Sequence, residues 1–214
     1  MADIPGDGEA TRLIEQAARG DQRAWAELLD PHRERLRRMV AFRLDRRLQG
    51  RVDPSDVIQE GCLDAVRRFP DYLGDPSTPF YLWLRYLVGQ RLMEHHRRHL
   101  GAQARDAGRE LTLYRGAMPE ATTAALAAQL LGRLTSPSQA AVRAERRLRM
   151  QEALNGLDPI DREILALRHF EQLSNSEAAA ALGLDKSAAS KRYTRALIRL
   201  KQVLGRLPGG PQEL

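Results

Sequence analysis

Apolar residues recur three or four positions apart along most of the 214-residue chain, and no segment alternates β-branched or apolar residues with polar ones. This spacing predicts helices throughout and no strands, so the expected fold class is all-α. In the first hundred residues Asp21, Asp53 and Thr78 stand just before apolar periods, and the last two are followed by proline, which is favoured in the first helical turn. We therefore expect three or four helices in a first domain over residues 1–100.

Start and stop signals return between residues 136 and 207, which predicts a second helical domain there. Ser174 and Glu177 have the spacing of a capping box, and Gly183 can take the left-handed conformation that ends a helix. Asp185 can then cap a long final helix. Two helices joined by so short a turn, the second one longer and basic, predict a helix-turn-helix.

The segment between these two domains has a different composition. Residues 101–135 are rich in Ala, Gly and Thr and lack a sustained apolar face. We interpret them as a flexible linker; the alternative is that a weakly helical piece near 124–131 packs as an extra helix. Residues 208–214 are interpreted as a short tail. The predicted organisation is two small helical domains joined by this linker.

The composition limits the classes of protein to which the chain can belong. A net charge of +6 and a pI near 10.0 permit nucleic-acid or membrane-surface partners. The single cysteine, Cys62, excludes an intramolecular disulfide and a structural zinc held by paired thiols. The first residues contain no signal-peptide core, and no run of about 18 apolar residues is present to span a bilayer. We therefore expect a cytoplasmic protein with no membrane partner.

The last predicted helix separates packing residues from outward-facing ones. Lys and Arg recur between residues 186 and 206 without an acidic residue, and small or hydroxylated residues lie between them. Such a surface lets a helix approach the major groove and donate hydrogen bonds to bases and phosphates. The alternative is a plain helical hairpin with a solvated basic face. If the helix reads DNA, the expected contacts are Lys186, Ser187, Ser190, Lys191, Arg192, Thr194 and Arg195.

The helix predicted after Thr78 carries aromatic residues in its first turns and basic residues in its last ones. Bases stack on aromatic rings while phosphates bind guanidinium groups, so this pattern favours contact with single-stranded nucleic acid. The alternative is that all of these rings belong to the core. The candidate contacts are Phe80, Tyr81, Trp83, Tyr86, Arg91, His95, Arg97 and Arg98.

Signatures of catalysis and of metal binding are missing from the sequence. It contains no Gly-rich phosphate loop, nucleophile elbow or zinc-peptidase pair. His95 and His99 have the spacing of two metal ligands on one helix face, but no carboxylate or thiol pattern completes the site, and Arg97 and Arg98 add repulsive charge. We expect no enzyme, no metal and no cofactor.

The helix predicted after Asp53 has an acidic side, which is unexpected in a chain with surplus positive charge. Its sequence is DPSDVIQEGCLDAVRRF, and one side of the helix is apolar. An acidic stripe repels nucleic acid, and an exposed apolar residue at its centre favours docking to a basic protein. The alternative is a face that is merely solvated. The candidate docking residues are Asp56, Gln59, Glu60, Leu63 and Asp64.

The order of these features resembles the bacterial RNA polymerase sigma factors of the extracytoplasmic-function (ECF) class. The acidic helix is similar to the polymerase-docking helix of that family, whose usual core is an Asp followed by Gln-Glu, here Asp56, Gln59 and Glu60. The segment TPFYLWLRYLVGQRLMEHHRR resembles the part that melts and reads the minus-ten promoter element. The segment LNGLDPIDREILALRHFEQLSNSEAAAALGLDKSAASKRYTRALIRLK resembles the domain that reads the minus-thirty-five element.

The resemblance implies a set of partners and functions. The acidic face would meet the basic clamp helices of the largest subunit of core RNA polymerase, with the flap as a further polymerase contact. The chain would bind double-stranded promoter DNA and the melted single strand, an anti-sigma factor is a possible partner, and the free protein would be a monomer. Ala188 and Ala189 stand where the family commonly has Thr-Val, and Ser190 stands at an often basic position.

We therefore expect a transcription initiation factor with a sigma region 2-like bundle and a sigma region 4-like helix-turn-helix domain. A helix-turn-helix regulator that acts alone would instead dimerise on a palindromic site without polymerase. A second alternative is an adaptor that binds proteins and not DNA. An enzyme that acts on nucleic acid is the least favoured interpretation.

Overall fold

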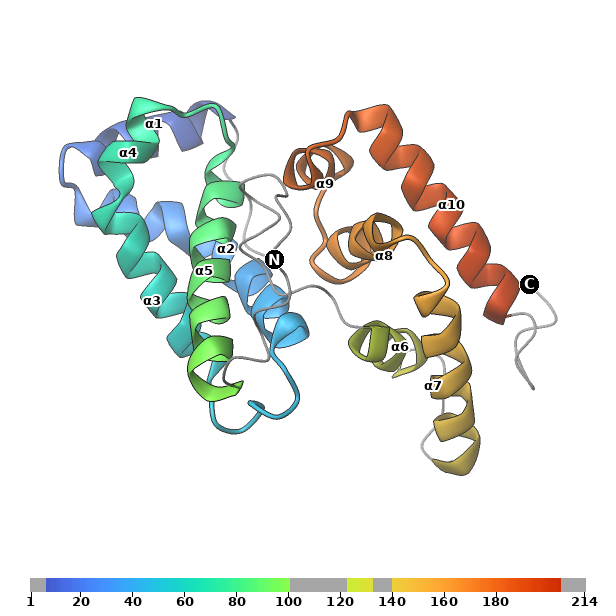
Figure 1. The fold of residues 1–214 in the computed structure, drawn as a ribbon. Coiled ribbons are helices and arrows are strands. Elements are labelled where there is room, and N and C mark those ends of the chain that lie inside the picture. Colours follow the sequence, from blue (N-terminus) through green and yellow to red (C-terminus); the bar gives the residue numbers. More distant parts are fainter. Residues whose placement is uncertain (1–6, 101–122, 133–139, 205–214) are drawn as a thin grey trace. The chain divides into compact units, whose positions relative to one another are not determined.

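The computed structural model describes residues 7–100, 123–132 and 140–204 of the chain. These residues are almost entirely helical, and the only bridge recorded among them is an isolated one between Gln49 and Val52. The all-α prediction is therefore confirmed. The chain divides into two compact units, Met1–Pro119 and Glu120–Leu214, each built from its own helices (Figure 1).

The first unit holds five described helices, one more than the upper number expected. Two of the predicted caps are confirmed: the Asp21 carboxylate accepts hydrogen bonds from the backbone N–H groups of Arg23 and Ala24, and the Asp53 carboxylate accepts one from Ser55. The helices are α1 (Asp7–Ala18), α2 (Gln22–Arg43), α3 (Pro54–Arg67), α4 (Phe69–Gly74) and α5 (Phe80–Leu100).

The additional helix is α4. The proline and glycine residues in and around this segment predict a turn and not a helix. Its six residues bury Phe69 and Tyr72 in the core of the first unit. The burial of these two rings explains why a short helix forms where local signals predict a turn, because tertiary packing outweighs local propensity in so short an element.

Helices α3 and α5 pack closely against each other, and a glycine makes that approach possible. Gly61 of α3 lies directly against Val88 of α5: a Cβ atom at Gly61 would stand 2.5 Å from Val88 Cγ2 and 2.8 Å from Val88 Cα. A side chain therefore cannot be accommodated without moving the backbone of α5. Ala65 of α3 and Leu84 of α5, both fully buried, belong to the same apolar core.

The second unit contains the predicted helix-turn-helix. The capping box of α9 is present, with Ser174 Oγ accepting a hydrogen bond from the Glu177 N–H and the Glu177 carboxylate accepting one from the Ser174 N–H. Gly183 ends α9 at φ +63°, and Asp185 accepts a hydrogen bond from the Ala188 N–H at the start of the final helix. The helices concerned are α8 (Pro159–Leu165), α9 (Asn175–Leu182) and α10 (Lys186–Leu204), with a π-helical turn at Ala166–Phe170 after α8.

The interpretation of residues 101–135 as a linker is wrong for part of the segment. Helix α6 (Thr123–Gly132) packs against α7 (Ala140–Asn155), with Leu126 and Ala127 fully buried. The unit boundary falls at Pro119, so α6 belongs to the second unit. Residues 101–122, the start signal near Ser136 and the tail 208–214 lie outside the described residues.

We predict that Gly61→Ala destabilises the first unit. Alanine favours a helix over glycine by about 1 kcal/mol, but overpacking a tight contact typically costs about 1–3 kcal/mol, and here backbone atoms obstruct the new methyl group. Urea unfolding followed by circular dichroism should show a lower midpoint for the variant. Gly8→Ala in α1 is the matched control, because its Cβ would meet nothing within 4 Å. Equal midpoints for the two variants would contradict the close α3–α5 contact.

Candidate functional site

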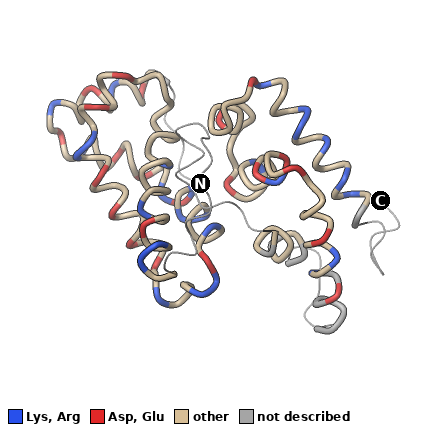
Figure 2. Tube along the Cα trace, in the orientation of Figure 1, with Lys and Arg blue, Asp and Glu red and all other residues tan. Residues whose placement is uncertain are grey.

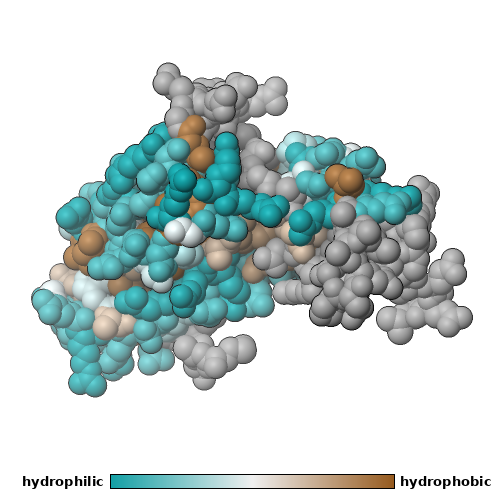
Figure 3. All heavy atoms as spheres, turned by 90° about the horizontal axis from the view of Figure 1, so that it is seen from below, coloured by the Kyte–Doolittle hydropathy of each residue, from teal (hydrophilic) through white to brown (hydrophobic). Residues whose placement is uncertain are grey.

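The outer face of α3 presents most of the predicted docking residues to solvent. Asp56 and Gln59 are exposed, Leu63 is 51% exposed, and Glu60 is partly exposed. Val66, which is 49% exposed, continues this face by one turn beyond Leu63. The helical spacing of three from Leu63 is the sequence signal that points to Val66. On the side of the molecule shown in Figure 3, hydrophobic residues emerge in small patches within a mostly hydrophilic surface.

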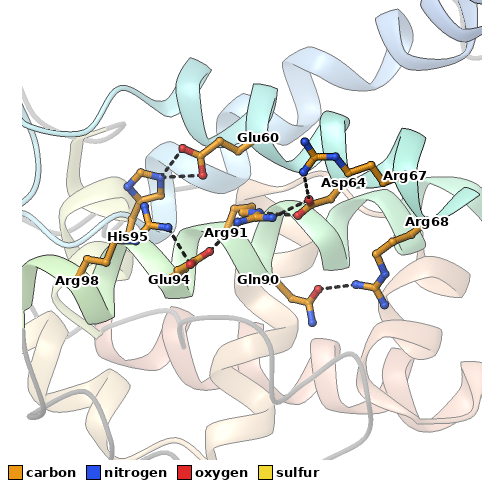
Figure 4. Close-up of polar contacts among 9 residues, drawn as sticks. All are labelled: Glu60, Asp64, Arg67, Arg68, Gln90, Arg91, Glu94, His95 and Arg98. Carbon is orange, nitrogen blue, oxygen red and sulfur yellow. Dashed lines mark hydrogen bonds and ion pairs between the residues drawn. The ribbon is translucent and has the colours of Figure 1, made fainter.

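Asp64 takes a different position from the other acids of α3. Arg91 of α5 donates two hydrogen bonds to its carboxylate, from Nη2 to Oδ1 at 2.6 Å and from Nε to Oδ2 at 2.5 Å (Figure 4). These hydrogen bonds hold the pKa of Asp64 below its ordinary value. The Asp64 side chain is only 14% exposed. In this structure Asp64 therefore joins α3 to α5, and it is less accessible than the other predicted docking residues.

Two of the cations predicted to bind DNA are joined by a shared acid on α5. Arg91 Nη1 donates to Glu94 Oε2 and Arg98 Nη2 donates to Glu94 Oε1, both at 2.8 Å. The pKa of Glu94 is lowered, mainly by the hydrogen bond from Arg98. Glu94 was not a predicted site residue, although its spacing from Arg98 is that of a helical ion pair. Arg91 is compensated by carboxylates on two helices, whereas Arg97 is exposed.

His95 lies against the outer face of α3, next to Glu60. Its Nε2 atom is 3.2 Å from Glu60 Oε2 and 3.3 Å from Oε1, and its side chain is 12% exposed (Figure 4). The rings of His95 and His99 are nearly parallel, with centroids 6.3 Å apart. Within the described parts of the chain, no group of three His, Cys, Asp or Glu residues is arranged to hold a metal ion.

Three of the four aromatic residues predicted to stack on bases are core residues. Phe80, Tyr81 and Trp83 are at most 8% exposed. Other side chains cover their rings: the Trp83 ring centroid lies 4.7 Å from that of Tyr72, and the Arg35 guanidinium stands 3.7 Å from the centre of the Tyr81 ring. The core alternative is therefore correct for these three rings.

Tyr86 differs from these rings because it is only half-buried. Its hydroxyl accepts a hydrogen bond from Gln90 Nε2 at 2.9 Å, and Gln90 in turn accepts one from Arg68 of the segment after α3. Tyr86 is thus the most accessible of the four predicted rings, and Arg97 and Arg98 are the exposed predicted cations, of which Arg98 is paired with Glu94.

The outward face of α10 carries six of the seven predicted recognition residues. Ala189, Ala196 and Leu200 are buried on its inner face and hold the helix on α8 and α9. The small size of the two alanines lets α10 lie close to its neighbours. Figure 2 shows Lys and Arg recurring along this helix. The exposed residues are Lys186, Ser187, Ser190, Lys191, Thr194 and Arg195, and Ile198 and Arg199 continue the same face.

Arg192, the seventh predicted recognition residue, faces inward. Its Nη1 atom donates to Asp161 Oδ1 at 2.8 Å and lies 3.7 Å from Asp158 Oδ1 at the start of α8. Asp161 is 2% exposed, so its carboxylate depends on this partner. In this structure Arg192 fixes α10 to α8, and its guanidinium is engaged by a carboxylate, unlike the other six predicted recognition residues.

The described structure thus combines a helical unit that exposes an acidic helix face with a second unit that exposes a basic helix-turn-helix. A basic helix-turn-helix together with a separate helical unit is typical of DNA-binding proteins of transcription. None of the helices described in either unit has both the length and the hydropathy needed to cross a lipid bilayer.

Comparison with known proteins assigns the chain to a family within that class. A family model described as ECF sigma factor matches residues 7–204, and the chain belongs to this family. The ECF RNA polymerase sigma factor SigD of Mycobacterium tuberculosis is 31% identical over 189 residues, which cover 88% of this chain and 81% of SigD. The RNA polymerase sigma factor CnrH of Cupriavidus metallidurans is 28% identical over 194 residues, covering 90% of this chain and 92% of CnrH.

A solved structure supports the fold. The structure of CnrH in complex with the cytosolic domain of CnrY matches 92% of this chain and 97% of CnrH, with a TM-score of 0.52 and 24% identity. The protein is therefore a transcription initiation factor of the sigma type, which binds core RNA polymerase and promoter DNA. Sigma factors are regulatory transcription factors.

We predict that Arg192→Ala destabilises the second unit by about 1–3 kcal/mol, because the buried Asp161 carboxylate loses its partner. Thermal unfolding of the full chain should show the loss. Lys191→Ala is the matched control: it removes the same charge from the neighbouring exposed position and should change the stability by no more than about 0.5 kcal/mol. If both variants unfold like the parent protein, the contact with Asp161 does not anchor α10.

Proposed function

We propose that the exposed face of α3 docks on the basic clamp helices of the largest subunit of core RNA polymerase, and that α10 reads the minus-thirty-five promoter element. In this proposal the first unit is the sigma region 2-like domain and the second is the region 4-like domain, with the flap as a further polymerase contact. The observation that carries the proposal is the opposite charge of the two exposed helix faces.

The docking proposal is supported by the composition of the α3 face. Asp56 and Glu60 carry negative charge, Gln59 offers hydrogen bonds, and Leu63 supplies exposed apolar surface at the centre. A surface of this kind attracts a basic protein helix and repels the phosphates of DNA. Asp64 contributes indirectly, by holding α3 in place through Arg91.

The DNA-reading proposal is supported by the geometry of α9 and α10. A capping box starts α9, and a left-handed glycine turns the chain into a longer helix whose outward face is basic and hydroxylated. Lysine and arginine on such a face bind phosphates and guanine, and serine or threonine reaches bases or phosphates. Arg195 and Lys191 are its central exposed cations.

Contact with the melted strand near the minus-ten element rests on fewer residues than the sequence indicates. Phe80, Tyr81 and Trp83 support the fold of the first unit from within its core. We assign the contact to the half-exposed ring of Tyr86 and to the exposed charge of Arg97, since stacking and phosphate binding need accessible groups.

Further partners and the cellular location follow from the same proposal. Core polymerase and its template are cytoplasmic, so the protein acts in the cytoplasm, as a monomer when free and without catalysing a reaction itself. The CnrH structure includes the cytosolic domain of CnrY. By analogy, an anti-sigma protein that covers part of this chain would control its access to polymerase.

We predict that Glu60→Lys weakens binding to core RNA polymerase roughly tenfold or more, because it places a like charge opposite the basic clamp. Fluorescence titration of labelled full-length protein with core polymerase measures the change. Glu9→Lys, which makes the same charge change at an exposed position of α1, should bind like the parent protein. Unchanged affinity for a folded Glu60→Lys variant would refute the docking assignment.

We predict that Arg195→Ala reduces binding to the upstream promoter element by about 1–3 kcal/mol while leaving polymerase affinity intact. Footprinting of the polymerase complex should show weaker upstream protection, and the salt dependence of DNA binding should decrease. Arg147→Ala, at an exposed arginine of α7, is the control and should leave protection unchanged. Full upstream protection with Arg195→Ala would exclude this role for the residue.

A further inference from the structure

The contact between His95 and Glu60 links a residue expected to bind DNA with a residue proposed to bind polymerase. Both carboxylate oxygens of Glu60 lie within 3.3 Å of the same ring nitrogen, Nε2 of His95. The two residues come from different helices, α3 and α5, and are 35 positions apart in the chain. The contact is therefore produced by the packing of α3 on α5 and not by local sequence.

The surroundings of the ring indicate which nitrogen carries the proton. Nδ1 of His95 is buried and makes no hydrogen bond with a described residue. A neutral histidine donates from one nitrogen and leaves the other as an acceptor. Nε2 faces a carboxylate, which can only accept, so the neutral ring donates from Nε2 to Glu60.

The environment of His95 is unsuited to a DNA phosphate. The side chain is only 12% exposed, and its Nε2–H group is directed at a carboxylate. A phosphate that approached this nitrogen would meet the negative charge of Glu60. Electrostatic repulsion therefore opposes the DNA contact that the sequence suggests.

The hydrogen bond from His95 can fix the orientation of the Glu60 carboxylate before a partner binds. The Glu60 side chain is 36% exposed, so the carboxylate that His95 contacts belongs to a side chain that a partner can still reach. A glutamate on a helix surface ordinarily samples many rotamers, and fixing one of them costs conformational entropy when a partner binds. A hydrogen bond that already holds the carboxylate reduces that cost.

We propose that His95 is a positioning residue for polymerase docking: it holds the Glu60 carboxylate in the orientation in which the α3 face meets its basic partner. This inference rests on the docking function proposed above. It assigns His95 to the protein-binding surface of the first unit, and it predicts that the His95 side chain affects polymerase affinity only through Glu60.

Two amide substitutions separate positioning from a general effect on structure. In His95→Gln the amide nitrogen lies about as far along the side chain as Nε2 and can donate to Glu60. In His95→Asn the amide ends near the place of Nδ1, where no acceptor is available. Full-length His95→Gln should therefore bind core polymerase within about twofold of the parent protein, whereas His95→Asn and His95→Ala should bind about three- to tenfold more weakly.

The same measurement in a Glu60→Ala background completes a double-mutant cycle. His95→Ala should have no further effect on polymerase affinity once Glu60 is absent, because the two residues act as one unit. Thermal unfolding of each variant verifies that the proteins compared are folded. Equal weakening by the Gln, Asn and Ala variants, or an undiminished effect of His95→Ala without Glu60, would overturn the proposal.

The remaining outcomes distinguish this inference from the docking function itself. If Glu60→Ala weakens polymerase binding but His95→Ala does not, docking stands and the positioning role fails. If Glu60→Ala leaves polymerase affinity unchanged, the docking assignment fails, and the inference fails with it. If His95→Ala reduces binding to promoter DNA and leaves polymerase affinity unchanged, His95 contacts DNA as its sequence context suggests, and the positioning role is refuted.

Discussion

The close packing of α3 against α5 is the constraint on which the first unit depends. Gly61 allows the two helices to approach until a methyl group no longer fits, and this approach brings Asp64 to Arg91 and Glu60 to His95. The apolar contact and the polar contacts support one another, because carboxylates of one helix reach hydrogen-bond donors of the other only at this separation. The same packing orients the outer face of α3 toward solvent.

Each unit joins two of its helices with an ion pair, but the exposed helix face is acidic in the first unit and basic in the second. Arg91 holds Asp64 in the first unit, and Arg192 holds Asp161 in the second, each joining two helices with an ion pair. The exposed acids of α3 and the exposed cations of α10 then remain for partners. Desolvation of the two charges offsets much of the attraction in such a pair, whereas loss of one partner leaves the other charge without compensation.

Signals from neighbouring residues predicted most of the helices and their caps. They could not predict the contacts that the site residues make with other helices. The caps at Asp21, Asp53 and Ser174 were predictable because each involves hydrogen bonds between residues two or three positions apart. The Asp64–Arg91 and Asp161–Arg192 pairs join residues 27 and 31 positions apart, so no local pattern contains them. A helical wheel places Asp64 and Arg192 at the edges of polar faces, where the neighbouring helix decides whether they point to solvent. The same limitation applies to α6, whose weak apolar face becomes clear only when α7 covers it.

The inward position of Arg192 has a consequence for how promoter preference can change over time. Arg192 and the buried alanines keep α10 in place, whereas the side chains of Ser190, Lys191, Thr194 and Arg195 are exposed and contribute little to the packing of the helix. Under the proposed DNA-reading role of α10, mutations at these positions would alter which bases are favoured without destabilising the domain that carries them. Related proteins could in this way come to control different genes while keeping the same packing of the helix-turn-helix domain.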